Sequence, residues 1–268
     1  MPPFALAAVR FFVAAVPLVF FVRRPQVPWR FVVAYGFLIG VCQFGLLFLG
    51  MKLGMSAGLS SLVIQVQVFF TIGLGIAYLG DRLSTQNLVG AVIASTGIAL
   101  LAAYKMMSGA TSTLIGFACV LIAALAWAGG NVVAKRAAGD HEADMFALVV
   151  WSSLVPPLPL AALSFLFEGG TAAWDAVTHA GWLAWGSVLF LAWVATLFGF
   201  ASWANLLHRY PTGLISPFAL LVPVSGLASG ALFLGESLAV TQIAGVLLVF
   251  AGLAVNVYGG KLRAWMAR

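Results

Sequence analysis

Several polar and aromatic side chains stand out because they lie near the middle of long apolar runs of the sequence. They are Gln43, Gln65, Gln67, Trp127, Trp193, Thr196 and Ser225. A buried amide or hydroxyl can hydrogen-bond the carboxylate or ammonium of a ligand without the desolvation cost of a full charge. A tryptophan face can stack on an aromatic ring or hold a cation. These residue types predict recognition of a small molecule rather than catalysis.

One further polar residue joins this group through its spacing. Trp127, Asn131 and Lys135 are four residues apart and therefore share one face of a helix. Gln65 and Gln67 point in different directions on a helix, so at most one of them faces the same cavity. The predicted substrate-binding residues are Gln43, Gln65, Trp127, Asn131, Trp193, Thr196 and Ser225. The alternative interpretation is that the amides tie helices together and the tryptophans anchor at interfaces or pack against lipid.

Arg10 lies inside an apolar run, about 9 Å along the helix that begins at Phe4. A guanidinium at that depth is costly unless it reaches the interface or finds a partner. It could bind a substrate carboxylate, and pairing with backbone carbonyls is the structural alternative.

Proline and glycine predict a hinge in the run that starts at Thr212. Pro217 and Pro223 each remove a helical hydrogen bond. With Gly226 they form the predicted hinge, for which a static kink is the alternative. Gly226 with Gly230, like Gly36 with Gly40, forms a GxxxG pair that permits close helix contact.

Residues for catalysis or proton transfer are not found inside the apolar runs. All seven acidic residues lie in loops or at helix ends: Asp81, Asp140, Glu142, Asp144, Glu168, Asp175 and Glu236. The histidines His141, His179 and His208 do so too. No ATP-binding loop and no metal-ligand cluster occurs, so we expect no enzyme activity, no metal site and no cofactor. Since coupled transporters usually carry an intramembrane carboxylate, facilitated diffusion or exchange is favoured over proton coupling.

The composition indicates the class of protein that holds these side chains. Of the 268 residues, 63% are hydrophobic and 7% charged, and the mean hydropathy is +1.10. Soluble domains carry about 25% charged residues. The composition excludes a water-soluble globule, a disordered chain and, despite the net charge of +6, a nucleic-acid binder. Cys42 and Cys119 lie in apolar runs and give no disulfide framework.

The apolar runs predict an all-α polytopic membrane protein. A helix needs about 20 apolar residues to cross a bilayer. Nine runs qualify: Phe4–Val22, Phe31–Met51, Ser56–Leu79, Gln86–Tyr104, Leu114–Ala134, Met145–Phe167, Trp182–Ala204, Thr212–Leu234 and Val240–Tyr258.

The basic residues predict the orientation. One set of loops and the C-terminus hold Arg23, Arg24, Arg30, Arg82, Lys135, Arg136, Arg209, Lys261, Arg263 and Arg268, whereas the opposite set holds only Lys52 and Lys105. The C-terminus is therefore expected in the cytoplasm. Nine crossings then place the N-terminus outside the cell. A tenth helix before the first one would return the N-terminus to the cytoplasm and make the number of spans even.

An internal repeat supports that expectation. At an offset of 155, residues 58–100 align without a gap with residues 213–255, and ten positions are identical. We expect a first repeat over residues 1–105, with four helices and lacking its first, and a second over 114–260 with five. An odd number of helices makes the two repeats opposite in orientation, which is typical of secondary transporters.

Four stretches carry a resemblance to a known family. They are PPFALAAVRFF near the start, ALAWAGGNVVAKR, and the related pair LGDRLSTQNLVGAVIASTGIAL and LGESLAVTQIAGVLLVFAGLAV. They resemble EamA-type transporters of the drug/metabolite transporter superfamily, which have ten helices in two inverted repeats. Within it the chain is most similar to YddG-type exporters of aromatic and other neutral amino acids. The small multidrug exporters of the superfamily use a glutamate in their first helix, the helix that we expect the first repeat to lack here.

The expected function is export of small neutral and aromatic amino acids across a bacterial inner membrane by alternating access. Facilitation or exchange is expected, by a monomer or weak dimer embedded in the lipid bilayer. One alternative is a proton-coupled exporter of drugs or amphiphilic metabolites. An alternative of another class is a non-transporting membrane assembly or channel subunit.

Overall fold

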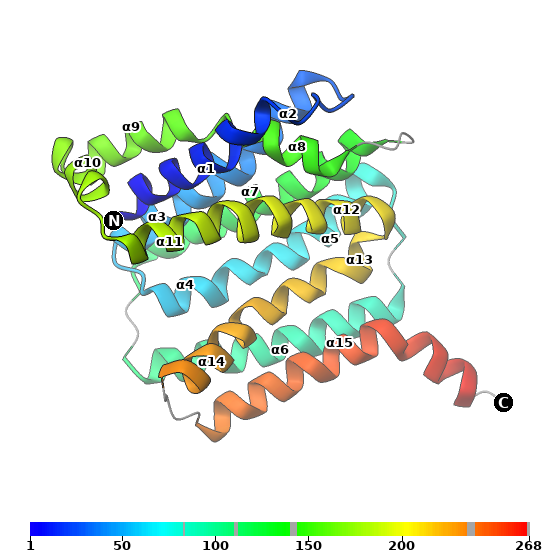
Figure 1. Ribbon diagram of the computed structural model, residues 1–268. Coiled ribbons are helices and arrows are strands. Elements are labelled where there is room, and N and C mark those ends of the chain that lie inside the picture. The colour runs from blue at the N-terminus through cyan, green and yellow to red at the C-terminus, as the bar shows by residue number, and fades with distance from the viewer. Residues whose placement is uncertain (83, 110–111, 140–143, 235–238, 267–268) are drawn as a thin grey trace. The chain divides into compact units, whose positions relative to one another are not determined.

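A computed structural model describes residues 1–82, 84–109, 112–139, 144–234 and 239–266. The acidic residues Asp140, Glu142 and Glu236, and His141, lie outside this set. Every regular element within it is a helix (Figure 1). The chain is an all-α polytopic membrane protein, as the sequence predicts.

Within the described residues, eight helical runs are long and apolar enough to cross a membrane. They are Trp29–Lys52, Ala57–Leu79, Thr85–Met107, Leu114–Ala138, Met145–Phe167, Trp182–Arg209, Thr212–Leu232 and Val240–Gly259. The ninth predicted span, Phe4–Val22, is shorter than expected: helix α1 runs from Pro3 to Val19 and has 17 residues. It ends ahead of the polar segment at Arg23, where a turn replaces the last predicted helical residues.

The helices form two compact units. Unit 1 comprises residues 1–49 and 125–209, and unit 2 comprises residues 50–124 and 210–268. Each unit therefore combines helices from both predicted repeats.

The elements of unit 1 are α1, α2 (Trp29–Tyr35), η1 (Gly36–Gln43), most of α3 (Phe44–Lys52), the second half of α7 (Leu114–Ala138), α8 (Met145–Ser152), α9 (Pro157–Phe167), α10 (Thr171–Thr178), α11 (Trp182–Leu189), η3 (Phe190–Phe200) and α12 (Ala201–Arg209). Those of unit 2 are the remainder of α3 and α7, α4 (Ala57–Val63), η2 (Ile64–Val66), α5 (Gln67–Leu79), α6 (Thr85–Met107), α13 (Thr212–Ile215), η4 (Ser216–Leu220), α14 (Leu221–Leu234) and α15 (Val240–Met266).

The core of unit 1 forms where α1 lies along α9 (Figure 1). Phe4 and Phe11 of α1 pack with Leu160 of α9 in one buried cluster. Glu168, directly after α9, accepts hydrogen bonds from the backbone N–H groups of Phe4 at 2.8 Å and Ala5 at 3.1 Å. Because the first N–H groups of a helix lack intrahelical partners, this carboxylate caps α1 and fixes it to α9.

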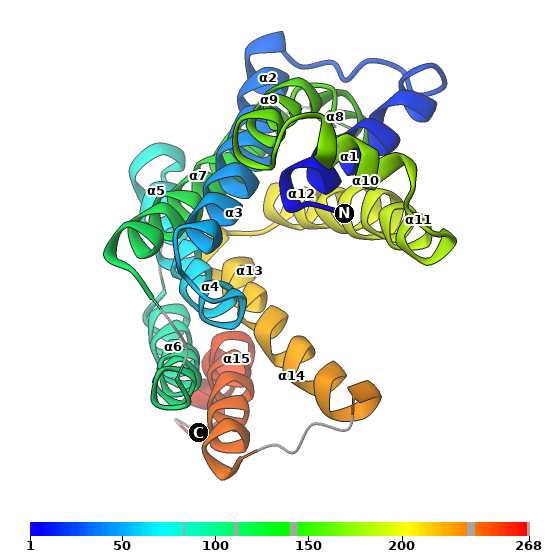
Figure 2. The same cartoon turned by 90° about the vertical axis from the view of Figure 1, so that its left-hand side faces the viewer.

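The core of unit 2 is the antiparallel pair α6 and α15, which lie side by side in both views (Figures 1 and 2). A Cβ placed on Gly90 would lie 2.6 Å from the carbonyl oxygen of Gly252, and one on Gly97 would lie 2.5 Å from that of Gly245. The offset of 155 pairs Gly90 with Gly245 and Gly97 with Gly252, so repeat-related glycines contact one another crosswise. This reciprocal, antiparallel packing is what two inverted copies of one helix produce.

Among the described residues, four of the spans contain a segment of another helix type. The π-helical segments η1 and η3 interrupt two spans of unit 1, and the 3₁₀ segments η2 and η4 interrupt two spans of unit 2. The offset of 155 brings residues 36–43 onto 191–198, inside η3, and residues 64–66 onto 219–221, across the junction of η4 and α14. The breaks therefore recur in corresponding spans of the two repeats. Such segments are frequent at functional sites.

Candidate functional site

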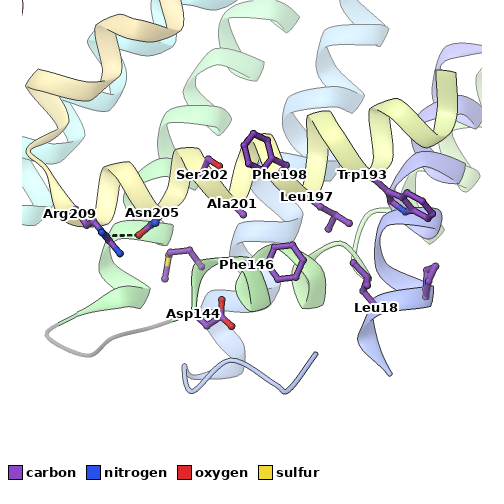
Figure 3. Close-up of a pocket in the computed structure, with 12 residues that line it drawn as sticks. Leu18, Asp144, Phe146, Trp193, Leu197, Phe198, Ala201, Ser202, Asn205 and Arg209 are labelled. Carbon is purple, nitrogen blue, oxygen red and sulfur yellow. Dashed lines mark hydrogen bonds between the residues drawn. The ribbon is translucent and has the colours of Figure 1, made fainter. Parts of the chain in front are cut away.

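A cavity in the described part of unit 1 has a volume of about 660 Å³. It lies between the end of α1, the start of α8, and the run formed by η3 and α12 (Figure 3). Its lining residues are Pro17, Leu18, Asp144, Met145, Phe146, Trp193, Leu197, Phe198, Ala201, Ser202, Asn205 and Arg209. A cavity of this size is within the range of small-molecule sites.

One end of this cavity is charged. Asn205 and Arg209 lie four residues apart on α12, and the Nε of Arg209 donates to the Oδ1 of Asn205 at 3.0 Å. This hydrogen bond orients the guanidinium and leaves its two terminal nitrogens available. Asp144 stands on the opposite wall, nearer to the Arg209 end than Leu18 does (Figure 3). The charged end therefore presents both a cation and an anion to one space.

Asp144 is placed by the helix that it starts. It is the N-cap of α8, and its Oδ1 accepts a hydrogen bond from the backbone N–H of Ala147 at 3.0 Å. An N-cap aspartate uses one carboxylate oxygen in this way. The second oxygen is available to a ligand.

The rest of the cavity is lined mainly by aromatic and aliphatic side chains. Phe146 of α8 and Phe198 of η3 both line the space, and Trp193 lies farther along η3 (Figure 3). The indole Nε1 of Trp193 donates to the carbonyl oxygen of Val13 at 3.4 Å, which attaches the ring to α1. Aromatic faces of this kind can receive an apolar or aromatic side chain.

Trp193 is the one predicted substrate-binding residue among those that line this cavity. Thr196, also in η3, is 1% exposed, and its Oγ1 donates to the carbonyl oxygen of Leu191 at 2.8 Å. The hydroxyl therefore satisfies a backbone group of the π-helical segment. Thr196 borders a nearly filled space beside Tyr35 and Phe200.

Gln43 and Arg10 are buried deeper in unit 1. Gln43 is the last residue of η1, and its Oε1 is buried without a hydrogen-bond partner. The Arg10 guanidinium carbon lies 4.1 Å from the ring centroid of Phe44 and 4.5 Å from that of Phe11. Its Nε and Nη2 have no hydrogen-bond partner, so these two donors do not make the backbone-carbonyl pairing considered from the sequence. Cation–π contacts hold the group instead.

Trp127 and Asn131 lie on α7, as their spacing predicts. The Oδ1 of Asn131 accepts a hydrogen bond from the indole Nε1 of Trp203 at 3.1 Å, so this amide joins α7 to α12. The Nε1 of Trp127 is buried without a partner, and its ring packs against the core of unit 1.

The other two predicted binding residues belong to unit 2. Gln65 lies in η2, is 2% exposed, and has an unpartnered Oε1. It lines an apolar cavity of about 280 Å³ together with Ser95, whose hydroxyl is also unpartnered. Ser225 is exposed on α14 and donates to the carbonyl oxygen of Val222 at 2.8 Å.

The predicted hinge residues lie at and just after the break η4. Pro217 is within η4, and Pro223 is the third residue of α14, where its missing N–H interrupts little of the helix.

The two GxxxG pairs predicted from the sequence differ in how closely their glycines pack against other helices. Gly36 and Gly40 pack closely, since a Cβ on Gly40 would lie 1.9 Å from the Cγ of Pro156, whereas Gly226 has no atom within 4 Å of an added Cβ. Gly226 thus makes no close helix contact of the expected kind.

Sequence reasoning missed the charged end of the cavity. Arg209 was counted only as a topological charge and Asp144 only as a loop acid, because both lie at helix ends. The spacing of Asn205 and Arg209 by four residues, next to an N-cap aspartate, was the available signal.

Comparisons with known proteins agree with this architecture. The model of the EamA-like transporter family matches residues 1–103 and 114–258. A relative from Salmonella typhimurium (strain LT2), described as a probable amino-acid metabolite efflux pump, is 42% identical over 264 residues and covers 98% of this chain and 88% of the relative. A relative of the same description from Escherichia coli (strain K12) is 39% identical with the same coverage. One crystal structure matches with a TM-score of 0.77 at 20% identity, over 96% of this chain and 89% of the other, and is similar in fold.

Proposed function

Because the chain belongs to the EamA-like transporter family, we propose that it exports small neutral amino acids, aromatic ones included, across a bacterial inner membrane. Two relatives at 42% and 39% identity are described as probable amino-acid metabolite efflux pumps. The observation that carries the proposal is the cavity of unit 1, which combines both charge signs with aromatic walls. An amino acid zwitterion has the complementary groups.

Recognition follows from the lining residues. The Arg209 guanidinium binds the substrate carboxylate, since its Nε is held by Asn205 and its terminal nitrogens are available. The free oxygen of Asp144 binds the ammonium group. Phe146, Trp193 and Phe198 contact the substrate side chain, which explains a preference that includes aromatic amino acids. A hydrogen bond to a charged group contributes about 1.5–3 kcal/mol, so two such contacts suffice for selection of zwitterions.

The cavity receives substrate from the cytoplasmic face. The excess of basic residues in the loops of that side supports a cytoplasmic position for the end of α12 and the start of α8. The carboxylates among the described residues lie outside the membrane spans, which favours facilitated diffusion or exchange over proton coupling; they are Asp81, Asp144, Glu168 and Asp175. No cofactor takes part in the proposed cycle, and the carrier acts as a monomer or weak dimer.

Alternating access uses the broken spans. We assign the bend of the Thr212–Leu234 run to Pro217, Pro223 and Gly226, because η4 already departs from α-helical geometry there. Unchanged turnover and unchanged binding in a Pro223→Ala variant would contradict this hinge.

Counterflow in proteoliposomes tests the proposed function. Vesicles preloaded with unlabelled amino acid are mixed with labelled phenylalanine, threonine or methionine, with and without a pH gradient. We expect saturable accumulation that does not depend on the gradient. Dependence on the gradient would favour the proton-coupled exporter, and uptake that does not saturate would favour a channel.

A further inference from the structure

Unit 2 contains a second cavity, of about 360 Å³, that the proposed function has not used. It lies between α4, α6, α14 and α15. Its lining residues are Gly58, Ser61, Leu62, Leu101, Lys105, Val222, Pro223, Gly226, Leu227 and Gln242. The volume is within the range of small-molecule sites, and the walls are mostly apolar.

Two hydrogen-bond donors reach this cavity from different helices. Lys105, in the last turn of α6, is partly buried and makes no hydrogen bond or ion pair in the described part of the chain. Gln242 of α15 is 7% exposed, and its Oε1 accepts a hydrogen bond from the backbone N–H of Ala239 at 2.9 Å. Because the amide oxygen is used there, the Nε2 is the group left for a ligand. An ammonium and an amide N–H that converge on one cavity suit a carboxylate.

The same cavity also offers an acceptor. The hydroxyl of Ser61 donates to the carbonyl oxygen of Gly58 at 2.8 Å, which leaves its lone pairs free to accept. Leu62, Leu101 and Leu227 supply the apolar wall. The cavity of unit 2 thus has donors, an acceptor and an apolar surface, which again match a zwitterion with an apolar side chain.

The membrane topology predicted from the sequence assigns Lys105 to one face of the membrane. The end of α6 and the start of α8 are separated by one crossing, α7. In the predicted topology Lys105 therefore lies on the face opposite Asp144, the face to which an exported substrate is released. Pro223 and Gly226 of the proposed hinge line the same cavity, so a bend of α14 would change its shape.

We propose that the cavity around Lys105 and Gln242 is a second substrate site, which binds the carboxylate of the exported amino acid on the releasing face of the membrane. This inference rests on the proposed function. The Lys105 ammonium binds the carboxylate, the Gln242 amide orients it, and the hinge residues couple occupancy of this site to the bend.

Face-resolved exchange tests the second site. Sealed vesicles of both orientations, inside-out and right-side-out, are used to measure the half-saturating concentration of phenylalanine at each face. We expect Lys105→Gln to raise this concentration about tenfold or more at the Lys105 face and to leave it unchanged at the opposite face, since one charged hydrogen bond is lost. Lys105→Arg, which keeps the charge, should restore most of the affinity. Lys52→Gln removes the other basic residue predicted on that face and is the matched control.

The outcomes separate this inference from the proposed function. If the wild type exchanges phenylalanine but Lys105→Gln acts equally at both faces or not at all, the second site is wrong and the exporter remains. If the effect of Lys105→Gln occurs only in vesicles with anionic lipid and at both faces, the cavity holds a lipid headgroup and the proposal is overturned. If the wild type exchanges no amino acid at either face, both proposals fail. The thermal stability of Lys105→Gln is compared with that of the wild type. Equal values show that a loss of affinity is not caused by misfolding.

Discussion

Asp144 combines two roles that can be separated chemically. One carboxylate oxygen caps α8 through the N–H of Ala147, and the side chain also lines the cavity of unit 1. Asparagine caps helices about as well as aspartate does, but it carries no charge. The cap and the proposed contact with the substrate ammonium therefore respond differently to substitution.

Asp144→Asn should keep the stability of the wild type and lose affinity for amino acids. We expect the half-saturating concentration of phenylalanine to rise about tenfold, because the ammonium loses an ionic hydrogen bond. Asp144→Ala should show the same loss and in addition a destabilisation of about 1 kcal/mol from the missing cap. Transport kinetics and thermal unfolding of the purified variants measure the two effects. An Asp144→Asn carrier with unaltered affinity would remove Asp144 from the site.

The elements divide into tightly packed helices and interrupted ones. The pair α6 and α15 is held by glycines whose backbones touch, and the hydrogen bond from the Nδ2 of Asn87 to the Oδ1 of Asn256 joins the same two helices. The four interrupted spans instead contain the π-helical and 3₁₀ segments. Since π-helical and 3₁₀ segments depart from regular α-helical hydrogen bonding, we assign rigidity to the first group and the conformational change to the second.

Gly97→Ala should destabilise the protein by about 1–3 kcal/mol, which is the usual cost of overpacking. Its Cβ would lie 2.5 Å from the carbonyl oxygen of Gly245, and a backbone atom on a rigid helix cannot move aside without separating α6 from α15. Gly73→Ala is the matched control, because Gly73 is also inside a helix but has no atom within 4 Å of an added Cβ. Alanine should there be neutral or stabilising by up to about 1 kcal/mol. Thermal unfolding in detergent compares the two, and equal effects would show that the glycine contact is not tight.

At the scale of the whole molecule, the sequence predicted the helical membrane class because long apolar runs have few other solutions in a bilayer. The span boundaries follow from hydropathy, and the first span, which ends at Val19, is three residues shorter at its C-terminal end than expected. The breaks at η1 and η3 were not predicted, since π-helical geometry depends on packing, such as that of Gly40 against Pro156, and not on local composition.

The candidate site was predicted less completely than the fold. Trp193, which was selected by its depth along a span, lines the cavity of unit 1, but depth alone cannot distinguish a cavity from a packed interior. Asn131 and Thr196 use their polar groups on Trp203 and on the π-helical backbone. The charged end of the unit 1 cavity could not be predicted from the sequence, because Asp144 and Arg209 line one space only when α8 and α12 pack together.

The most direct test of the account asks whether the cavity of unit 1 binds the substrate carboxylate in a working carrier. The measurement is counterflow of labelled phenylalanine by Arg209→Gln, compared with the wild type and with Arg30→Gln, a basic residue predicted on the same face and outside the cavity. The account predicts that Arg209→Gln raises the half-saturating concentration about tenfold or more, while Arg30→Gln behaves as the wild type. Arg209→Gln and Arg30→Gln carriers that both match the wild type would contradict it.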